Sequence, residues 1–138
     1  MTVVVCVDDR GGMTFNGRRQ SRDKVLCEDI INSLGEGERL CISAYSRILF
    51  ENFTSRVVIC DALLENAGKT DVCFVEDRDI SLYLLRIDRL IIYRWNRHYP
   101  ADTYFEIIPE NENFCLAASK EFCGSSHEKI TKEIYVKC

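Results

Sequence analysis

The stretch TVVVCVDDRGGMTFNGRRQSRDKVLCEDIINSLG, from Thr2 to Gly35, sets out the first units of the fold. Thr2–Val7 is an apolar and mostly β-branched run, which is typical of a strand buried on both faces of a parallel sheet. Asp8–Asn16 contains two adjacent glycines, and we expect a loop there. Ser21 is the expected N-cap of a helix, because apolar residues then recur at helical spacing until Gly35. The stretch therefore predicts a strand, a loop and a helix.

This alternation of strand and helix patterns continues as far as Trp95. Short apolar runs predict four more strands, and the segments between them have short helical patterns. The expected strands are Arg39–Ser43, Arg56–Cys60, Val72–Val75 and Arg89–Trp95. The expected helical segments are Ser46–Phe53, Ala62–Ala67 and, capped by Asp79, Ile80–Ile87. The order predicts βαβ units and a mainly parallel sheet with helices on both of its faces.

The pattern changes in the tail of the chain. Asn113–Phe122 and Lys129–Lys137 have the composition of two strands, and a loop containing Gly124 joins them. We therefore predict an antiparallel hairpin that completes the sheet. The expected fold class is α/β: a single domain over residues 1–138, with a three-layer α/β/α architecture around a mixed, mainly parallel sheet.

Composition narrows the function. The chain has 138 residues and a net charge of −4, which argues against general nucleic-acid binding. Its apolar runs are too short to span a bilayer, so no membrane partner is expected. Asp8 and Asp9 interrupt the first apolar run, which lacks the pattern of a signal peptide. We expect a cytoplasmic protein.

The chain contains eight cysteines. No two form a C-x-x-C pair, so the usual spacings of zinc and redox sites are absent and no metal site is predicted. Most of the cysteines lie in apolar runs, where a free cysteine behaves as a small buried hydrophobic residue. We favour reduced, buried thiols over the metal and disulfide alternatives.

A cluster of basic residues surrounds the start of the first helix, where acidic residues are usual. It consists of Arg18, Arg19, Arg22 and Lys24. One interpretation is a binding site in which arginines and the helix N-terminus hold a phosphate or carboxylate. The other is an exposed loop balanced by neighbouring acidic residues. The sequence leaves both open.

Three segments, taken in order, resemble the dihydrofolate reductase family. VVVCVDDRGGMTFNGRRQSRDKVLCEDI is similar to the family's opening strand, its glycine-containing loop and the helix that carries its catalytic acid. DRLIIYRWNRHYPADTYFEI resembles a later strand and its Asp-Thr-x-Phe turn, and GSSHEKITKEIYVKC resembles the last strand. The resemblance implies the family's mixed sheet with a C-terminal antiparallel hairpin. It also implies NADPH-dependent reduction of a pterin-like substrate.

The resemblance assigns roles to individual positions. The family's catalytic acid, which binds the pterin ring and supports its protonation, corresponds to Asp23. The alternative for Asp23 is a simple first-turn residue that favours the helix dipole. The active-site threonine of the family corresponds to Tyr93. Together with the arginines of the basic cluster, the predicted ligand-binding residues are Arg18, Arg19, Arg22, Tyr45 and Tyr93.

The implied cofactor site departs most from the family. The segment that contacts the cofactor phosphates corresponds to Ser43-Ala44-Tyr45-Ser46-Arg47, and the family's Gly-Gly pair to Glu76-Asp77. Glycine lets a backbone approach a pyrophosphate closely, whereas two carboxylates would repel it. The implied NADPH-binding residues are Ser43, Ala44, Ser46, Arg47, Glu76 and Asp77, and we expect NADPH binding to be impaired.

Three functions follow from these features. The first is a divergent, shortened dihydrofolate-reductase-like protein without efficient NADPH-dependent reduction, which keeps a cleft near Asp23 for a small anionic or heterocyclic ligand. The second is a functional NADPH-dependent reductase of a pterin-like substrate. The third is a non-catalytic interaction protein whose sheet edge or C-terminal hairpin binds a partner or a second copy of the chain, for example as a homodimer.

Overall fold

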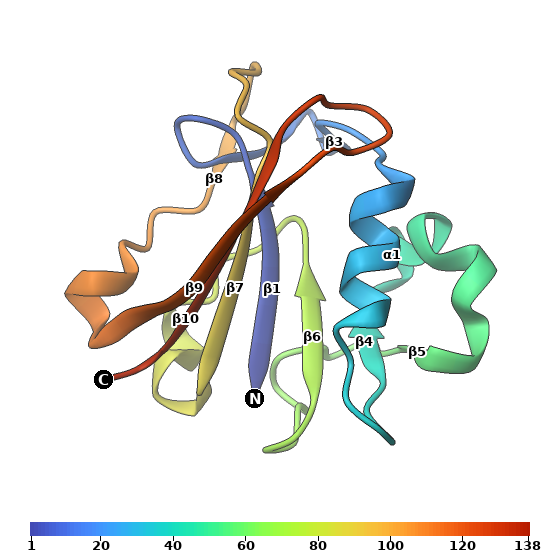
Figure 1. The fold of residues 1–138 in the computed structure, drawn as a ribbon. Helices are drawn as coiled ribbons and strands as arrows, with labels where there is room; N and C mark the ends of the chain where they lie inside the picture. The colour runs from blue at the N-terminus through green and yellow to red at the C-terminus, as the bar shows by residue number, and fades with distance from the viewer.

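The computed structural model describes residues 1–138, and its centre is a seven-stranded sheet in the order β5-β4-β6-β1-β7-β10-β9 (Figure 1). The five strands from β5 to β7 are parallel to their neighbours, and β10 runs antiparallel to both β7 and β9. The strands are β1 (Thr2–Val7), β4 (Leu40–Ile42), β5 (Val57–Ile59), β6 (Val72–Val75), β7 (Arg89–Arg94), β9 (Phe114–Phe122) and β10 (Ile130–Lys137). The predicted mixed sheet with an antiparallel C-terminal hairpin is confirmed.

Strand β1 lies at the centre of this sheet, between β6 and β7. Val3 and Val5 are completely buried on one face, in a different core cluster from Val4 on the other face. A strand covered on both sides needs apolar side chains at every position, which is why its sequence is a continuous β-branched run. β1 therefore carries the loop that follows it to the carboxyl-end edge of the sheet.

One face of the sheet is covered by helix α1 (Lys24–Asn32) and by η1 (Ala44–Arg56), a 3-10 segment with a kink. Leu26 and Ile30 of α1 pack in the same cluster as Phe50 and Phe74. The rings of Phe50 and Phe74 meet edge to face, with centroids 5.2 Å apart. No helix of the structure has the length and apolar character needed to cross a membrane.

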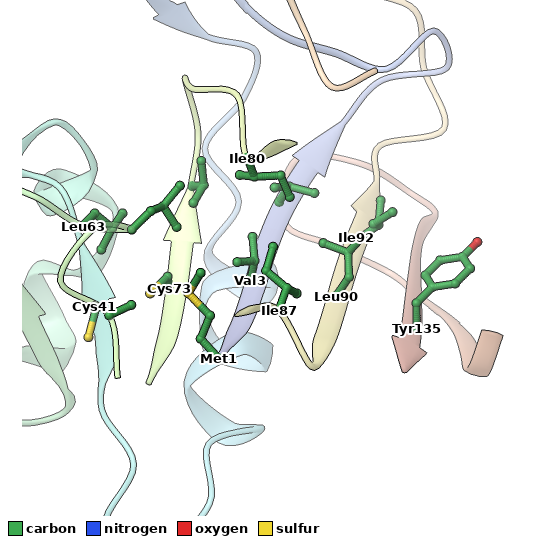
Figure 2. Close-up of a cluster of buried hydrophobic side chains, with 14 of the residues drawn as sticks. Met1, Val3, Cys41, Leu63, Cys73, Ile80, Ile87, Leu90, Ile92 and Tyr135 are labelled. Carbon is green, nitrogen blue, oxygen red and sulfur yellow. The ribbon is translucent and has the colours of Figure 1, made fainter. Parts of the chain in front are cut away.

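The opposite face carries a cluster of buried hydrophobic side chains (Figure 2), and no α-helix covers it. Leu63, Leu64, Ile80 and Ile87 bury their side chains there against Val3 and Leu90, among others. The helix expected at Ala62–Ala67 was wrong, because these residues form turns, and the helix expected at Ile80–Ile87 is only the short 3-10 segment η2 (Ser81–Arg86). Adjacent leucines, both buried, fit a turn pressed onto the sheet better than one face of a helix.

The expected loop at Asp8–Asn16 also contains a strand, β2 (Gly12–Phe15). It pairs antiparallel with β3 (Arg18–Arg19) and with β8 (Thr103–Tyr104) in a separate three-stranded sheet. Asn16 and Gly17 have φ angles of 51° and 70°. Two successive residues with positive φ make the tight turn that joins hairpin strands, and Asn-Gly is its usual sequence.

The hairpin β9–β10 follows η3 (Pro109–Glu112) and is closed by a disulfide between Cys115 and Cys138. The expectation of eight reduced cysteines was wrong for this pair. Hairpin pairing sets Cys115 opposite Val136, and the N–H of Cys138 donates to the carbonyl of Asn113, so the two sulfur atoms meet. Six cysteines remain free, of which Cys27, Cys41 and Cys73 are buried.

Candidate functional site

A cavity lies where β1 and β6 end, at the edge of the sheet where open α/β sheets bind their ligands. Arg19, Asp23, Glu76 and Trp95 are among the residues that line it. Its volume is only ≈ 20 Å³, which is room for about one water molecule. Pockets that hold drug-sized ligands enclose roughly 300 Å³ or more. The side chains around this cavity explain why it is so small.

Asp23 is the N-cap of α1. Its backbone is extended (φ −129°, ψ 114°), and Oδ1 accepts a hydrogen bond from the N–H of Leu26 at 2.9 Å. The cap predicted at Ser21 was therefore wrong, because the helix begins at Lys24 and only the residue before it can satisfy the first-turn amides. Asp23 is 3% exposed.

The same carboxylate also anchors loop 123–128. Oδ1 accepts from the N–H of Ser125 at 3.0 Å, and Oδ2 accepts from the N–H and the hydroxyl of Ser126, each at 2.7 Å. Burial alone would raise the pKa of Asp23, but these hydrogen bonds and the one from Leu26 outweigh it and lower the pKa to about 2. At neutral pH the Asp23 carboxylate is ionised, each of its two oxygens accepts two hydrogen bonds, and it has no proton to donate.

His127 extends this network on the far side of Ser126. Its Nδ1 lies 2.6 Å from the hydroxyl oxygen of Ser126, and its Nε2 lies 2.6 Å from that of Tyr99. Its ring stacks on Trp95 with centroids 4.7 Å apart. Burial, followed by the charge of Arg97, lowers the pKa of His127. Because the imidazole is then neutral, one self-consistent chain donates from Tyr99 to His127, from His127 to Ser126, and from Ser126 to Asp23.

Arg19 and Glu76 close the other side of the cavity. The Nε and Nη2 atoms of Arg19 donate to the two carboxylate oxygens of Glu76 at 2.9 and 3.0 Å. Nη2 also donates to the carbonyl of Tyr45 at 2.8 Å, and the guanidinium lies 4.4 Å from the centroid of the Tyr45 ring. Ser46 donates its hydroxyl proton to Glu76 at 2.7 Å. Hydrogen bonding to Glu76 raises the pKa of Arg19.

The structure thus brings four of the predicted site residues together, and they bind one another. The side chains of Arg19 and Glu76 are only 13% and 8% exposed, and bidentate pairing of this kind is both strong and geometrically specific. Tyr45 and Ser46 complete the contacts. No distance in this cluster leaves space for another group between the guanidinium and the carboxylate.

The remaining predicted residues lie outside this cluster. Arg18, Arg22, Ala44 and Arg47 are exposed, and Ser43 makes no capping hydrogen bond at the start of η1. Asp77 is exposed and faces Arg78 at 3.7 Å. The N–H groups that an anion at the start of α1 would need are partly occupied, because Lys24 donates to the hydroxyl oxygen of Ser125 and Leu26 to Asp23.

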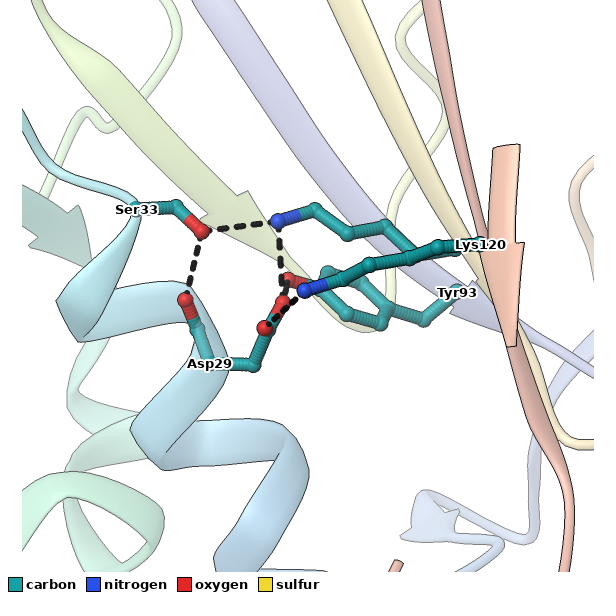
Figure 3. A network of polar contacts seen from close by, with 5 residues as sticks. Asp29, Ser33, Tyr93 and Lys120 are labelled. Carbon is teal, nitrogen blue, oxygen red and sulfur yellow. Dashed lines mark hydrogen bonds and ion pairs between the residues drawn. The ribbon is translucent and has the colours of Figure 1, made fainter. Parts of the chain in front are cut away.

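Tyr93 faces helix α1 and is not among the residues lining the cavity (Figure 3). Its hydroxyl donates to Asp29 at 2.6 Å, and the ammonium groups of Lys120 and Lys132 donate to the same carboxylate at 2.8 and 2.9 Å. Lys132 also donates to Ser33 at 2.7 Å. Burial, followed by the hydrogen bond to Asp29, raises the pKa of Tyr93. This network fastens α1 to the hairpin.

Sequence reasoning missed His127, Tyr99 and the loop serines. Their roles come from contacts between segments that lie far apart in the chain, such as the 103 residues between Asp23 and Ser126. The one local signal was the Gly-Ser-Ser-His run at 124–127, which is rich in residues that donate to a carboxylate.

No family model matches the sequence, and no curated protein matches it either. Among solved structures, the chain is similar to dihydrofolate reductase from Enterococcus faecalis, complexed with NADP(H) and RAB-propyl. The TM-score is 0.63 at 12% sequence identity, and the match covers 99% of this chain and 95% of that chain. The comparison confirms the predicted dihydrofolate-reductase-like fold.

Proposed function

We propose that this chain, which has the fold of dihydrofolate reductase, is a divergent protein that does not carry out efficient NADPH-dependent reduction. The observation that carries the proposal is the bidentate pair between Arg19 and Glu76 at the end of β6. A pyrophosphate approaching this edge meets the carboxylates of Glu76 and Asp77. Opening the pair would also leave a largely buried charge without its partner, at a cost of about 3–5 kcal/mol.

Asp23 supports the same proposal. A catalytic acid needs a pKa near the working pH, whereas the hydrogen bonds from Ser126, Leu26 and Ser125 hold the pKa of Asp23 down at about 2. The carboxylate stabilises a helix and a loop, and a ligand that took up its hydrogen bonds would undo both. A small anionic or heterocyclic ligand would instead have to displace Glu76 from Arg19.

The direct test is an assay of dihydrofolate-dependent NADPH oxidation by the full chain, followed by absorbance. A known dihydrofolate reductase in the same buffer is the positive control. We expect no oxidation above the rate without protein. Turnover that saturates in both substrates would overturn the proposal and restore the reductase as the function of this fold.

A second candidate function is self-association, and strand β9 favours it. β9 is the last strand of the sheet, is nine residues long, and pairs with β10 only. Residues 115–121 are all exposed, and Leu116 is 51% exposed. A long open edge presents unpaired N–H and C=O groups, which a second copy of the same strand can satisfy. β5 at the opposite edge has only three residues.

Two proline variants test this candidate by sedimentation. Successive N–H groups of a strand point to opposite sides of it. Of the two variants Ala118→Pro and Ser119→Pro, one therefore removes an N–H that points away from the sheet, and the other removes an N–H that bonds to β10. We expect a dimer for the unmodified chain, and a folded monomer for the variant that keeps the original melting temperature. A monomeric unmodified chain over roughly a hundredfold range of concentration would contradict self-association.

A further inference from the structure

Three free thiols, two in neighbouring strands and one directly after the edge strand β5, meet on one face of the sheet, away from the site described above. Cys41 of β4 is the direct partner of Cys73 in the parallel pair with β6. Both belong to the same core cluster, and Cys60 packs against it (Figure 2). The N–H of Cys60 donates to the carbonyl of Ile42 at 2.8 Å, which holds it beside β4. Cys41 is therefore the middle thiol of the three.

The neighbouring thiols change the acidity of Cys41. The adjacent thiols of Cys73 and, to a smaller extent, Cys60 lower the pKa of Cys41, although burial and the charge of Asp71 act in the opposite direction. The same proximity raises the pKa of Cys73. The thiolate is the nucleophilic form of cysteine. Of the two paired thiols, Cys41 is therefore the one that ionises first.

Cys27 shows the effect of burial where the main charged neighbours are acidic side chains. It is 5% exposed and Cys41 is 8% exposed, so both side chains are buried. Burial and the nearby charge of Asp23 raise the pKa of Cys27 to about 12. A buried thiol of this protein is therefore unreactive by default, and the difference at Cys41 comes from the adjacent thiols.

The geometry permits a bond between Cys41 and Cys73. Neighbouring strands are about 4.8 Å apart, and directly paired residues therefore fall in the range of roughly 4.4–6.8 Å between Cα atoms that disulfides need. The three thiols do not make a group that could hold a metal ion. Cys60 is partly exposed at the edge of the sheet and gives a small oxidant its approach.

We propose that Cys41 and Cys73 form a peroxide-sensitive modification site, which closes to a disulfide across β4 and β6. The Cys41 thiolate attacks one oxygen of hydrogen peroxide, the O–O bond breaks, and a sulfenic acid and hydroxide result. The sulfur of Cys73 then attacks the Cys41 sulfur, the S–S bond forms, and the S–O bond breaks. The thiol protons convert both departing oxygens to water. Two thiols are oxidised by two electrons and one peroxide is reduced.

The test uses the full chain, reduced and then exposed to hydrogen peroxide, with alkylation of remaining thiols and peptide mass spectrometry. In the unmodified chain we expect a Cys41–Cys73 cross-link, while Cys27 stays open to alkylation after unfolding. The rate of cross-linking should rise with pH as the Cys41 thiolate forms, and then level off. Cys27→Ser is the matched control and should leave both the product and the rate unchanged.

Two variants separate the steps. Cys73→Ser should stop the reaction at a sulfenic acid on Cys41, which dimedone traps, and Cys41→Ser should abolish the cross-link. The proposal fails if the unmodified chain oxidises Cys27 as fast as Cys41, or if no bond between Cys41 and Cys73 forms. These two outcomes are read from the unmodified chain, so they hold even where a variant does not fold.

Discussion

At the scale of single residues, Asp23 connects the fold to the site. Its carboxylate caps α1 and accepts three hydrogen bonds from loop 123–128. The pKa of Asp23 is lower in the folded chain, at about 2, than in the unfolded chain. Its contribution to stability is therefore fully present above about pH 4 and is lost as the pH falls through 2.

Replacing this carboxylate should expose that dependence. We expect Asp23→Asn to lower the free energy of unfolding at pH 7 by about 1–2 kcal/mol, because an amide accepts fewer of the four hydrogen bonds. The difference in free energy of unfolding between Asp23→Asn and the unmodified chain should shrink as the pH falls towards 2. Urea unfolding at a series of pH values measures it. Glu128→Gln, on the same loop, is the control, and an equal loss there would contradict the assignment.

Arg19 and Arg18 are adjacent but lie in different environments. Arg19→Ala should lower the free energy of unfolding by about 3–5 kcal/mol, since it leaves the largely buried Glu76 without its ion-pair partner. Arg18→Ala should change it by less than about 0.5 kcal/mol, because the side chain is exposed. Chemical denaturation compares the two. If Arg19→Ala and Arg18→Ala cost the same, the pair does not close the cavity.

At the scale of elements, the contact between α1 and loop 123–128 leaves no space at Gly124. A Cβ there would lie 2.3 Å from Oδ2 of Asp23 and 2.5 Å from Cδ1 of Ile130. Gly124→Ala should therefore lower the free energy of unfolding by about 1–3 kcal/mol. Gly68→Ala is the control, because its Cβ would meet only ordinary contacts from 3.5 Å. Thermal melts measure the difference. Equal decreases in melting temperature for Gly124→Ala and Gly68→Ala would contradict this prediction, because they would show that loop 123–128 moves aside at no cost.

The hairpin offers a second test at this scale. The Cys115–Cys138 disulfide spans 23 residues, and a cross-link of that length stabilises a fold by about 3 kcal/mol. Cys115→Ser should lower the free energy of unfolding by a similar amount without reductant, and by far less in the presence of dithiothreitol. An unchanged stability under oxidising conditions would mean that the bond does not form in solution.

Elements with one strong local pattern were predictable. β1, β6 and β7 follow from their apolar runs, and the hairpin follows from its alternation. Elements that depend on distant partners were not predictable from local sequence. Strand β2 pairs with β8, which lies about 90 residues later in the chain. The turns at Ala62–Ala67 depend on packing against the sheet.

At the scale of the whole molecule, fold and site diverge. The resemblance carried by three sequence segments predicted the sheet correctly, and it also assigned Asp23 and Glu76 to a candidate site. It did not predict that Arg19 and Glu76 bind each other, because that contact joins positions 57 residues apart and depends on side-chain geometry. The fold of dihydrofolate reductase is therefore present, while the side chains of Arg19 and Glu76 pair beside the small cavity at this edge of the sheet.

A calorimetric titration of the full chain with NADPH tests this account most directly. If the Arg19–Glu76 pair closes this edge of the sheet, we expect no saturable heat of NADPH binding up to about 1 mM cofactor. Saturable binding with a Kd below about 10 µM would contradict it, because the Arg19–Glu76 pair would then have to open at little cost.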